Sequence, residues 1–312
     1  MITKILLFFR SEKAVSEQPI ELEYKKTGIN PDEITLLRRW LDTQPHLPSK
    51  YISDLDLLLC YYSCYRSTAV TKQVIDLHYT LKTLFTNFFK DRAVDDKIIT
   101  ALNTTLILPL QTLSHDGYTV VYHRVIDTDT KNFVFRHIIK AALMLMDLRQ
   151  YEIGTIPGML LVVDMNGVSM SHLGKLDLLT LQQFLYYLQE AMLVRLKGIH
   201  FMNAPSFVDK LLMLIRPFLK KELMDILYIH QVGSKSIEKF FPIEALPKES
   251  GGQYVSVYDA MQENVERLQA NTHYFNVEAK KRVIEAERPG KPKTINDIFG
   301  GVEGSFKKLE ID

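Results

Sequence analysis

The fold is decided by the stretch MLLVVDM at residues 159–165, an apolar run of strand length interrupted only by its aspartate. The segments around it differ in pattern. Residues 118–125 are rich in β-branched and aromatic side chains, whereas residues 132–148 and 176–193 repeat apolar side chains at helical spacing. Strands that alternate with helices are typical of a mainly parallel sheet with right-handed crossovers. The sequence therefore predicts an α/β fold.

The same alternation continues toward the C-terminus. Residues 199–202 and 227–229 are expected to form short strands, separated by a long helix over residues 207–219. From Asn276 onward the chain is polar and carries glycine and proline, which is typical of an extended tail that packs on the surface or is partly disordered.

The N-terminal third of the chain has helical periodicity over residues 30–92. Asn30 can cap a helix that begins at Pro31, and a break follows at Pro45 to Pro48. We therefore expect three units: a helical module over residues 1–95, the α/β domain over 96–255, and a C-terminal helix with an extended tail over 256–312.

Composition excludes one class of function. The 312 residues include 38 lysines and arginines against 37 aspartates and glutamates, for a formal charge of +1. No field over the whole molecule favours nucleic acid, so we expect no nucleic-acid partner, and any basic site must be local.

Two further patterns indicate a cytoplasmic protein. The apolar run Ile5 to Phe9 is too short for a signal-peptide core and leads into charged residues. No apolar run approaches the roughly 18 residues that a membrane span needs. Cys60 and Cys64, four residues apart in an apolar stretch, are expected to be buried free thiols, with a partial metal site as the alternative.

No enzyme motif considered matches this sequence at every required position. The segment GVSMS at residues 167–171 resembles a nucleophile elbow except at its last position, where the tight turn requires glycine. The glycines at residues 300–304 lack the spacing of a dinucleotide site, and no zinc-protease or P-loop signature occurs. We predict a protein that is not an enzyme and needs no cofactor or metal, and a hydrolase centred on Ser171 and His172 is a weak alternative.

Three titratable residues end predicted strands, namely Asp164, His200 and His230. Ligands of open α/β sheets gather at such strand ends, so these residues could build a site. We favour the structural interpretation, in which their side chains hydrogen-bond the turns that close the sheet.

Several segments in fixed order resemble the CRAL-TRIO lipid-transfer family, which includes alpha-tocopherol transfer protein and retinaldehyde-binding proteins. The resemblance rests on the run 160–164 with Gly167 and the Ser171-His172 pair, and on the segment VRLKGIHFMNAP at residues 194–205. Residues 216–219, 229–230 and 246–252 then follow in the family's order. The N-terminal residues 41–48 are similar to the three-helix region that precedes this domain, and residues 301–306 are similar to the tails of insect members.

The resemblance implies a monomeric, cytoplasmic carrier that associates peripherally with membranes and holds its cargo in an apolar cavity under a lid helix. It leaves tocopherol, retinoid, carotenoid and phospholipid cargoes open. The positions that match the family's cavity wall are Phe135, Ile138, Ala142, Val163, Phe184, Leu188, Val194, Leu196 and Ile199. The apolar stripe of the matching lid helix includes Phe207, Leu211, Leu214 and Ile215.

A basic segment overlaps the lid. Between residues 193 and 221 six basic residues face one acidic residue, Asp209, which leaves a local charge of +5. Such a segment suits docking on anionic lipid, at about 1 kcal/mol per basic residue near the surface, although a solvated helix face is the alternative. We expect the membrane or phosphoinositide contacts at Arg195, Lys197, Arg216, Lys220 and Lys221.

The resemblance supports phosphoinositide binding only in part. Family members that bind these headgroups place basic residues where Arg195 and Lys197 stand, but their later basic positions fall here on Glu222 and Ile226. Two hypotheses follow: a carrier of a hydrophobic small molecule, or an adaptor that keeps the fold and binds a phosphoinositide membrane or a signalling protein.

Overall fold

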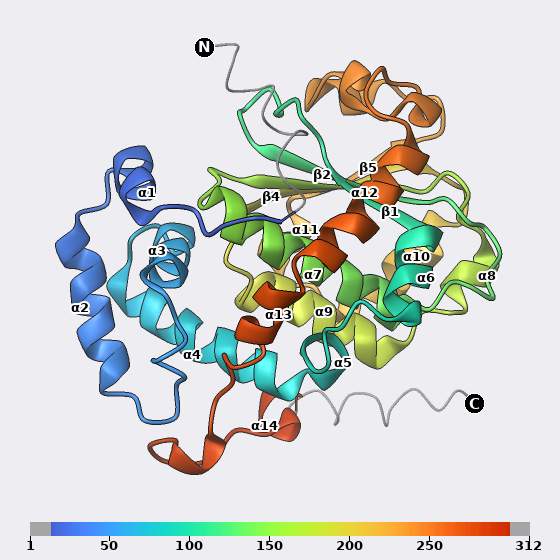
Figure 1. Cartoon of the computed structure of the whole chain (residues 1–312). Coiled ribbons are helices and arrows are strands. Elements are labelled where there is room, and N and C mark those ends of the chain that lie inside the picture. The colour runs from blue at the N-terminus through green and yellow to red at the C-terminus, as the bar shows by residue number, and fades with distance from the viewer. Residues whose placement is uncertain (1–13, 300–312) are drawn as a thin grey trace.

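A computed structural model describes residues 14–299 of the chain and shows a single five-stranded sheet (Figure 1). The sheet order is β1-β2-β3-β4-β5, with β1 antiparallel to β2 and all other neighbours parallel. The strands are β1 Thr105–Pro109, β2 Thr119–Val125, β3 Met159–Asp164, β4 Leu196–Ala204 and β5 Leu227–Gln231. The predicted α/β class with a mainly parallel sheet is confirmed.

The N-terminal helices form a module beside the sheet (Figure 1). They are α1 Ile20–Thr27, α2 Pro31–Asp42, α3 Asp54–Ser63, α4 Thr68–Leu84 and α5 Thr86–Phe89. Asn30 caps α2 as the sequence predicts: its side chain accepts a hydrogen bond from the amide of Asp32, and Glu33 completes the capping box. Helix α2 buries one face through Ile34, Leu37 and Leu41.

Of the remaining helices, α6 leads into β1, and the others connect later strands or follow the sheet. They are α6 Asp96–Thr104, α7 Phe135–Ile153, α8 Met170–Leu173, α9 Leu178–Glu190, α10 Val208–Ile215, α11 Lys221–Met224, α12 Val257–Ala270, α13 Thr272–Glu278 and α14 Ile295–Phe299. Short 3-10 turns lie at Arg216–Phe218, Ser236–Lys239, Ile243–Ala245, Lys248–Ser250 and Glu285–Glu287. No described helix is long and apolar enough to cross a membrane.

The two faces of the sheet pack against different partners because successive strand residues point to opposite sides. On β2, Val120 and Tyr122 join a core with Phe241 and Val257 from the C-terminal part of the chain. Val121, His123 and Val125 point to the other face, which α7, α9 and α10 cover.

The helix expected over residues 207–219 is shorter than predicted. Helix α10 ends at Ile215 and the chain continues as a 3-10 turn through Pro217. Proline has no amide hydrogen to donate to the carbonyl four residues earlier, so the α-helical ladder stops there.

Buried charges join parts of the chain that are distant in sequence. Lys82 of α4 contacts Asp147 of α7 and Glu278 of α13, both at 3.0 Å. The guanidinium of Arg92 lies 2.7 Å from Asp147 and 3.1 Å from Glu278. The N-terminal module, the α/β part and the C-terminal segment therefore share one ionic cluster, in which each buried charge has an opposite partner.

The polar segment after Asn276 packs against the N-terminal helices. Arg288 lies 2.6 Å from Asp76 of α4, and the ring of Phe299 stacks on that of Phe85 with centroids 5.8 Å apart. The apolar run Ile5 to Phe9 and the stretch 301–306, for which a resemblance to tails of insect members was noted, lie outside the described residues. The division into three units near residues 95 and 255 stays a prediction.

Candidate functional site: an apolar cavity

A cavity of about 240 Å³ lies between one face of the sheet and the helices that cover it. Its floor follows the two-residue alternation of the strands. The floor residues are Ile107 from β1, Val121, His123 and Val125 from β2, Met159, Leu161 and Val163 from β3, Met165 just beyond it, Ile199 and Phe201 from β4, and Leu227 from β5.

The helical wall uses spacings of three and four residues. From α7 it takes Phe135, Ile138, Ile139, Ala142, Leu143 and Met146, and from α9 it takes Leu181, Phe184, Leu185 and Leu188. Helix α10 closes the cavity with Leu211 and Ile215, one turn apart. Every lining residue is apolar except His123 and His172.

The structure brings together most of the residues that the sequence assigned to the cavity. The wall includes Phe135, Ile138, Ala142, Val163, Phe184, Leu188, Ile199, Leu211 and Ile215. Val194, Leu196, Phe207 and Leu214 do not line it. The first two pack in the adjoining apolar core, and Phe207 precedes α10 and packs near its base. Contact of any of these residues with cargo stays a prediction.

Sequence reasoning missed much of the floor. On β2 and β3, the alternate positions Val121, Val125 and Leu161 carry the signal, because a strand covered on one face presents every second residue to it. His123 carries the same alternation signal, because it stands between Val121 and Val125 on β2, but a polar residue was not expected on an apolar wall. His123 lies between Ile107 and Val163 in the sheet register, and His172 comes from the short helix α8.

Both cavity histidines are neutral at pH 7. Burial lowers the pKa of His123 to about 4, and burial also lowers the pKa of His172. Neutral imidazole carries one hydrogen-bond donor and one acceptor. The cavity therefore offers hydrogen bonds from its wall without offering a charge.

The hydrolase alternative requires Ser171 and His172 to be paired, and the structure pairs His172 with a different serine. Nδ1 of His172 is paired with the hydroxyl of Ser169 at 2.8 Å, while Ser171 is exposed. The capping box of α8 explains this pair as a helix start.

Asp164 ends β3 and His230 lies near the end of β5, but His200 lies within β4 rather than at a strand end. Nε2 of His200 has no hydrogen-bond partner among the described residues, whereas the other polar side-chain atoms of these three residues are hydrogen-bonded. His200 and His230 pair at 3.0 Å, and the second ring nitrogen of His230 lies 2.7 Å from the Ser236 hydroxyl. Asp164 accepts hydrogen bonds from Tyr122 and Asn203. These contacts favour the structural interpretation of the three residues.

The cysteines are free, and no cluster of metal-ligating side chains occurs within residues 14–299. Burial raises the pKa of the Cys60 thiol. At Cys64, a hydrogen bond with Cys60 lowers the thiol pKa more than burial raises it, and the pKa falls to about 7.

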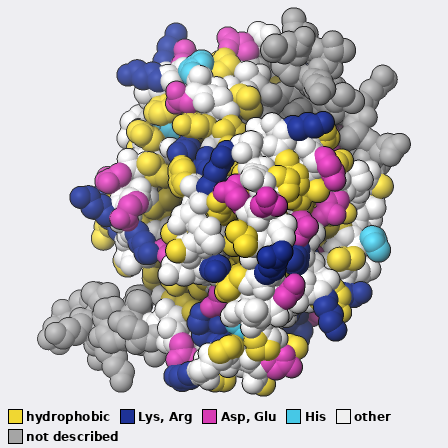
Figure 2. Space-filling view, turned by 90° about the vertical axis from the view of Figure 1, so that its left-hand side faces the viewer, with side chains coloured by type: hydrophobic (Ala, Val, Ile, Leu, Met, Phe, Trp, Pro, Cys, Tyr) yellow, Lys and Arg dark blue, Asp and Glu magenta, His cyan; other side chains and the backbone are white. Residues whose placement is uncertain are grey.

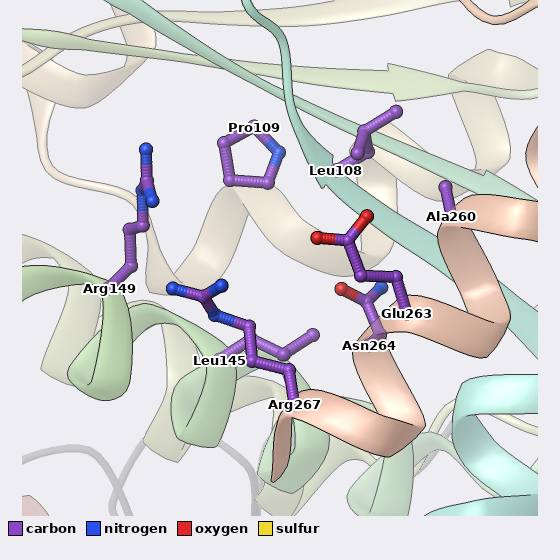
Figure 3. A pocket seen from close by; sticks show the side chains of 8 residues that line it. All are labelled: Leu108, Pro109, Leu145, Arg149, Ala260, Glu263, Asn264 and Arg267. Carbon is purple, nitrogen blue, oxygen red and sulfur yellow. The ribbon is translucent and has the colours of Figure 1, made fainter. Parts of the chain in front are cut away.

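A second, smaller hollow of about 50 Å³ lies between α7, α12 and the end of β1 (Figure 3). Arg149, Glu263 and Arg267 point toward it. Glu152 pairs with both arginines, and a second carboxylate, Glu263, lines the same hollow, so two acidic residues face the two cations. This hollow is small and its arginines already form ion pairs, so it is a weaker candidate for a binding site than the apolar cavity.

The expected membrane contacts lie in two places. Arg195 and Lys197 stand at the beginning of β4, where the Arg195 guanidinium packs over the rings of Tyr62 and Tyr65 at 4.0 and 4.1 Å from their centroids. Lys197 donates to the Tyr65 hydroxyl at 2.9 Å.

The other three basic residues lie between α10 and β5. Arg216 and Lys221 are exposed, and Lys220 pairs with Glu190 at 2.5 Å. On the side of the N-terminal module that Figure 2 shows, basic and acidic side chains are interspersed rather than gathered by sign. Membrane contact by these five residues stays a prediction.

Two family models match this chain. The CRAL/TRIO domain model matches residues 103–252, and the Pinta-like UBA domain model matches residues 29–99. Clavesin-1 of Pongo abelii is 25% identical over 248 residues, covering 77% of this chain and 70% of that protein. Clavesin-2 of Homo sapiens is 27% identical over 163 residues, covering 52% of this chain and 50% of that protein. The solved structure of Sfh5 aligns with a TM-score of 0.41 and 16% identity over 66% of this chain and 74% of that one. The chain belongs to the CRAL-TRIO family of lipid-binding and lipid-transfer proteins.

Proposed function

We propose that this protein carries one hydrophobic small molecule in the cavity under α10 and transfers it between membranes without chemically changing it. The observation that carries the proposal is the cavity itself. It is walled by apolar side chains from every strand of the sheet and from four helices, α7, α8, α9 and α10. Most domains of this size fill such a space with side chains, because interiors are close-packed.

The volume suits a small apolar ligand after modest adjustment. Small-molecule sites span roughly 300–1,000 Å³, and this cavity is slightly smaller at about 240 Å³. Met146, Met159, Met165 and Met192 line it. Methionine is unbranched and adapts to irregular shapes, so these side chains supply the room that a ligand needs.

Helix α10 has the composition of a lid. Its inner face gives Leu211 and Ile215 to the cavity, whereas Met213 on its outer face is 70% exposed. Met213 is close in sequence to the exposed basic residues Arg216 and Lys221. An exposed apolar side chain with nearby cations suits a membrane surface, where the methionine would enter lipid and the cations would meet anionic headgroups.

We further propose that the protein acts as a cytoplasmic monomer that docks on anionic membranes, including those that contain phosphoinositides. Arg216 and Lys221 support this through their exposure. Arg195 and Lys197 contribute less directly, because their side chains already contact tyrosines of the N-terminal module. The cargo classes proposed are tocopherols, retinoids, carotenoids and phospholipids.

Native mass spectrometry of freshly purified protein tests the proposal. We expect one bound hydrophobic molecule per chain, released when the protein is denatured. Transfer of the identified molecule from donor to acceptor vesicles then tests carriage. A chain that is always empty, and that takes up no lipid from vesicles of mixed composition, would favour the adaptor hypothesis instead.

A further inference from the structure

The hydrogen-bonding of His172 fixes which of its ring nitrogens is the donor. The backbone amide of Ser169 lies 3.1 Å from Nδ1 of His172 and can only donate, so Nδ1 accepts. The neutral ring then carries its proton on Nε2. The imidazole is thus held in one tautomer by the beginning of α8.

That donor has no partner among residues 14–299. Nε2 of His172 is buried and makes no hydrogen bond, and the whole residue is 2% exposed. Its aromatic neighbour is Phe133, whose ring lies perpendicular to the imidazole with centroids 5.0 Å apart. Both side chains line the cavity. Burial of an unpaired N–H is unfavourable, so an oxygen atom delivered into the cavity would gain by reaching it.

The rest of the lining restricts the kind of oxygen. No lysine or arginine lines the cavity, and burial lowers the pKa of both cavity histidines. A carboxylate or phosphate inside would lose its hydration without meeting a cation, which is strongly unfavourable. A hydroxyl or carbonyl needs only one hydrogen bond.

We propose that the cavity selects an uncharged, mostly hydrocarbon molecule with one hydroxyl or carbonyl group, whose oxygen accepts the Nε2 proton of His172 after the Phe133 ring is displaced. This inference rests on the proposed carrier function and narrows its cargo. It excludes any lipid whose charged headgroup would have to enter the cavity.

His123 is the natural comparison because it is the other polar residue of the wall. Its ring makes no hydrogen bond within the described residues, so nothing fixes which nitrogen carries the proton. It can turn toward or away from a ligand and gives a weaker preference than the fixed donor of His172.

The test is a competition among three probes that share one chain length: dodecanol, dodecane and dodecanoate. Full-length protein is incubated with vesicles that contain equal amounts of the three probes, separated from the vesicles, and extracted, and the bound probes are quantified by gas chromatography. We expect the wild type to enrich dodecanol about tenfold over dodecane, the ratio that corresponds to about 1.4 kcal/mol. Dodecanoate should be the least enriched.

Variants locate the selectivity. His172→Phe should bring the dodecanol to dodecane ratio near one while total probe uptake persists, and His123→Phe should stay within about threefold of the wild-type ratio. His172→Gln is the second variant, because a glutamine oxygen can accept the Ser169 amide as in a capping box and preserve the start of α8. It should also lose the preference, with a melting temperature close to that of the wild type.

The outcomes separate the inference from the proposed function. Equal uptake of dodecanol and dodecane by the wild type, an unchanged ratio in both His172 variants, or loss of the ratio only in His123→Phe would overturn the role of His172 and leave the carrier function standing. Uptake of none of the three probes by the wild type would overturn the carrier function and this inference with it.

Discussion

Arg195 packs its guanidinium against the ring of Tyr65, 4.1 Å from the ring centroid, although the two residues lie far apart in sequence. Tyr62 covers the guanidinium as well and accepts a hydrogen bond from it through its carbonyl oxygen. Tyr65 and Arg66 both have positive φ, at 54° and 62°, which is uncommon for residues other than glycine. The turn between α3 and α4 thus brings tyrosine to the position where the family resemblance predicted an open basic surface.

Because Arg195 is packed against tyrosines, we expect the exposed residues Arg216 and Lys221 to make the main contact with anionic membranes. Charge reversal at the exposed pair, Arg216→Glu with Lys221→Glu, should slow transfer to anionic vesicles several-fold and leave cargo affinity unchanged. The rate for the wild type should fall with salt, because attraction to an exposed patch is screened within roughly 10 Å at 0.1 M ionic strength. Stopped-flow transfer of a fluorescent lipid measures both effects.

Charge reversal at the other pair, Arg195→Glu with Lys197→Glu, should also slow transfer to anionic vesicles, but with loss of stability. Each cation–π contact of a partly buried arginine contributes about 0.5–2 kcal/mol, so thermal unfolding should begin at a lower temperature. Equal transfer by both charge-reversed proteins and the wild type to phosphoinositide-containing vesicles would show that the basic segment is only a solvated surface.

Filling the cavity should separate ligand binding from folding. Ala142 lines the cavity, so Ala142→Trp should place its added bulk in empty space and abolish most cargo uptake with little loss of stability. Its neighbour Ala141 is 1% exposed and packed in the core, where the same substitution overpacks and costs about 1–3 kcal/mol. Denaturant unfolding and lipid uptake compare the two variants. If Ala142→Trp unfolds as readily as Ala141→Trp, position 142 is ordinary core.

The outer face of the lid predicts a defect that does not depend on vesicle charge. Met213 is 70% exposed, so Met213→Ser should leave thermal stability within about 0.5 kcal/mol of the wild type, as is usual at the surface. If this side chain enters lipid, transfer to neutral and anionic vesicles should slow by a similar factor. A variant that transfers at the wild-type rate to both would remove Met213 from the docking surface.

Asp76 predicts a pH dependence of stability. Burial raises its pKa, but hydrogen bonds from Lys293, Arg288 and His46 outweigh burial and lower the pKa to about 2. A carboxylate with a depressed folded-state pKa stabilises the protein above its unfolded pKa of about 3.9, and that stabilisation is lost as the pH falls toward 2. Asp76→Asn should therefore cost about 1–2 kcal/mol at pH 7 after allowance for solvent screening.

Urea unfolding across pH values checks that prediction. The difference between Asp76→Asn and the wild type should be constant from pH 7 down to about 5 and should narrow below pH 4. A difference that persists unchanged at pH 3 would mean that the ion pairs of Asp76 do not stabilise the folded state.

The sheet was predictable because its strands carry local signals. The apolar run that ends at Asp164 is β3, and the helical spacing at residues 132–148 and 176–193 predicted α7 and α9. Strand β1 and helix α1 were not predicted, since each is short and gains its stability from packing that a local pattern does not record.

The sequence could predict many residues of the cavity wall, but it could not predict that a cavity lies between them. An apolar residue such as Ala142 looks the same in sequence whether it borders empty volume or packed side chains. Val194 and Leu196 pack in the apolar core beside the cavity, and the register between β3 and β4, which shifts after Met159, pairs Leu196 with Met159; their contact with cargo stays a prediction. Arg195 and Tyr65 come into contact only through tertiary packing, so no local sequence pattern could predict that contact.

The ionic cluster around Lys82 has a consequence for synthesis on the ribosome. Its second carboxylate, Glu278, leaves the ribosome long after the helices that carry Lys82 and Asp147. Until then two buried cations, those of Lys82 and Arg92, share a single aspartate, and an uncompensated buried charge is strongly destabilising. We therefore expect the N-terminal helices to dock firmly only after residue 278 has been synthesised, and a chain that ends before Glu278 should expose more apolar surface than the full chain.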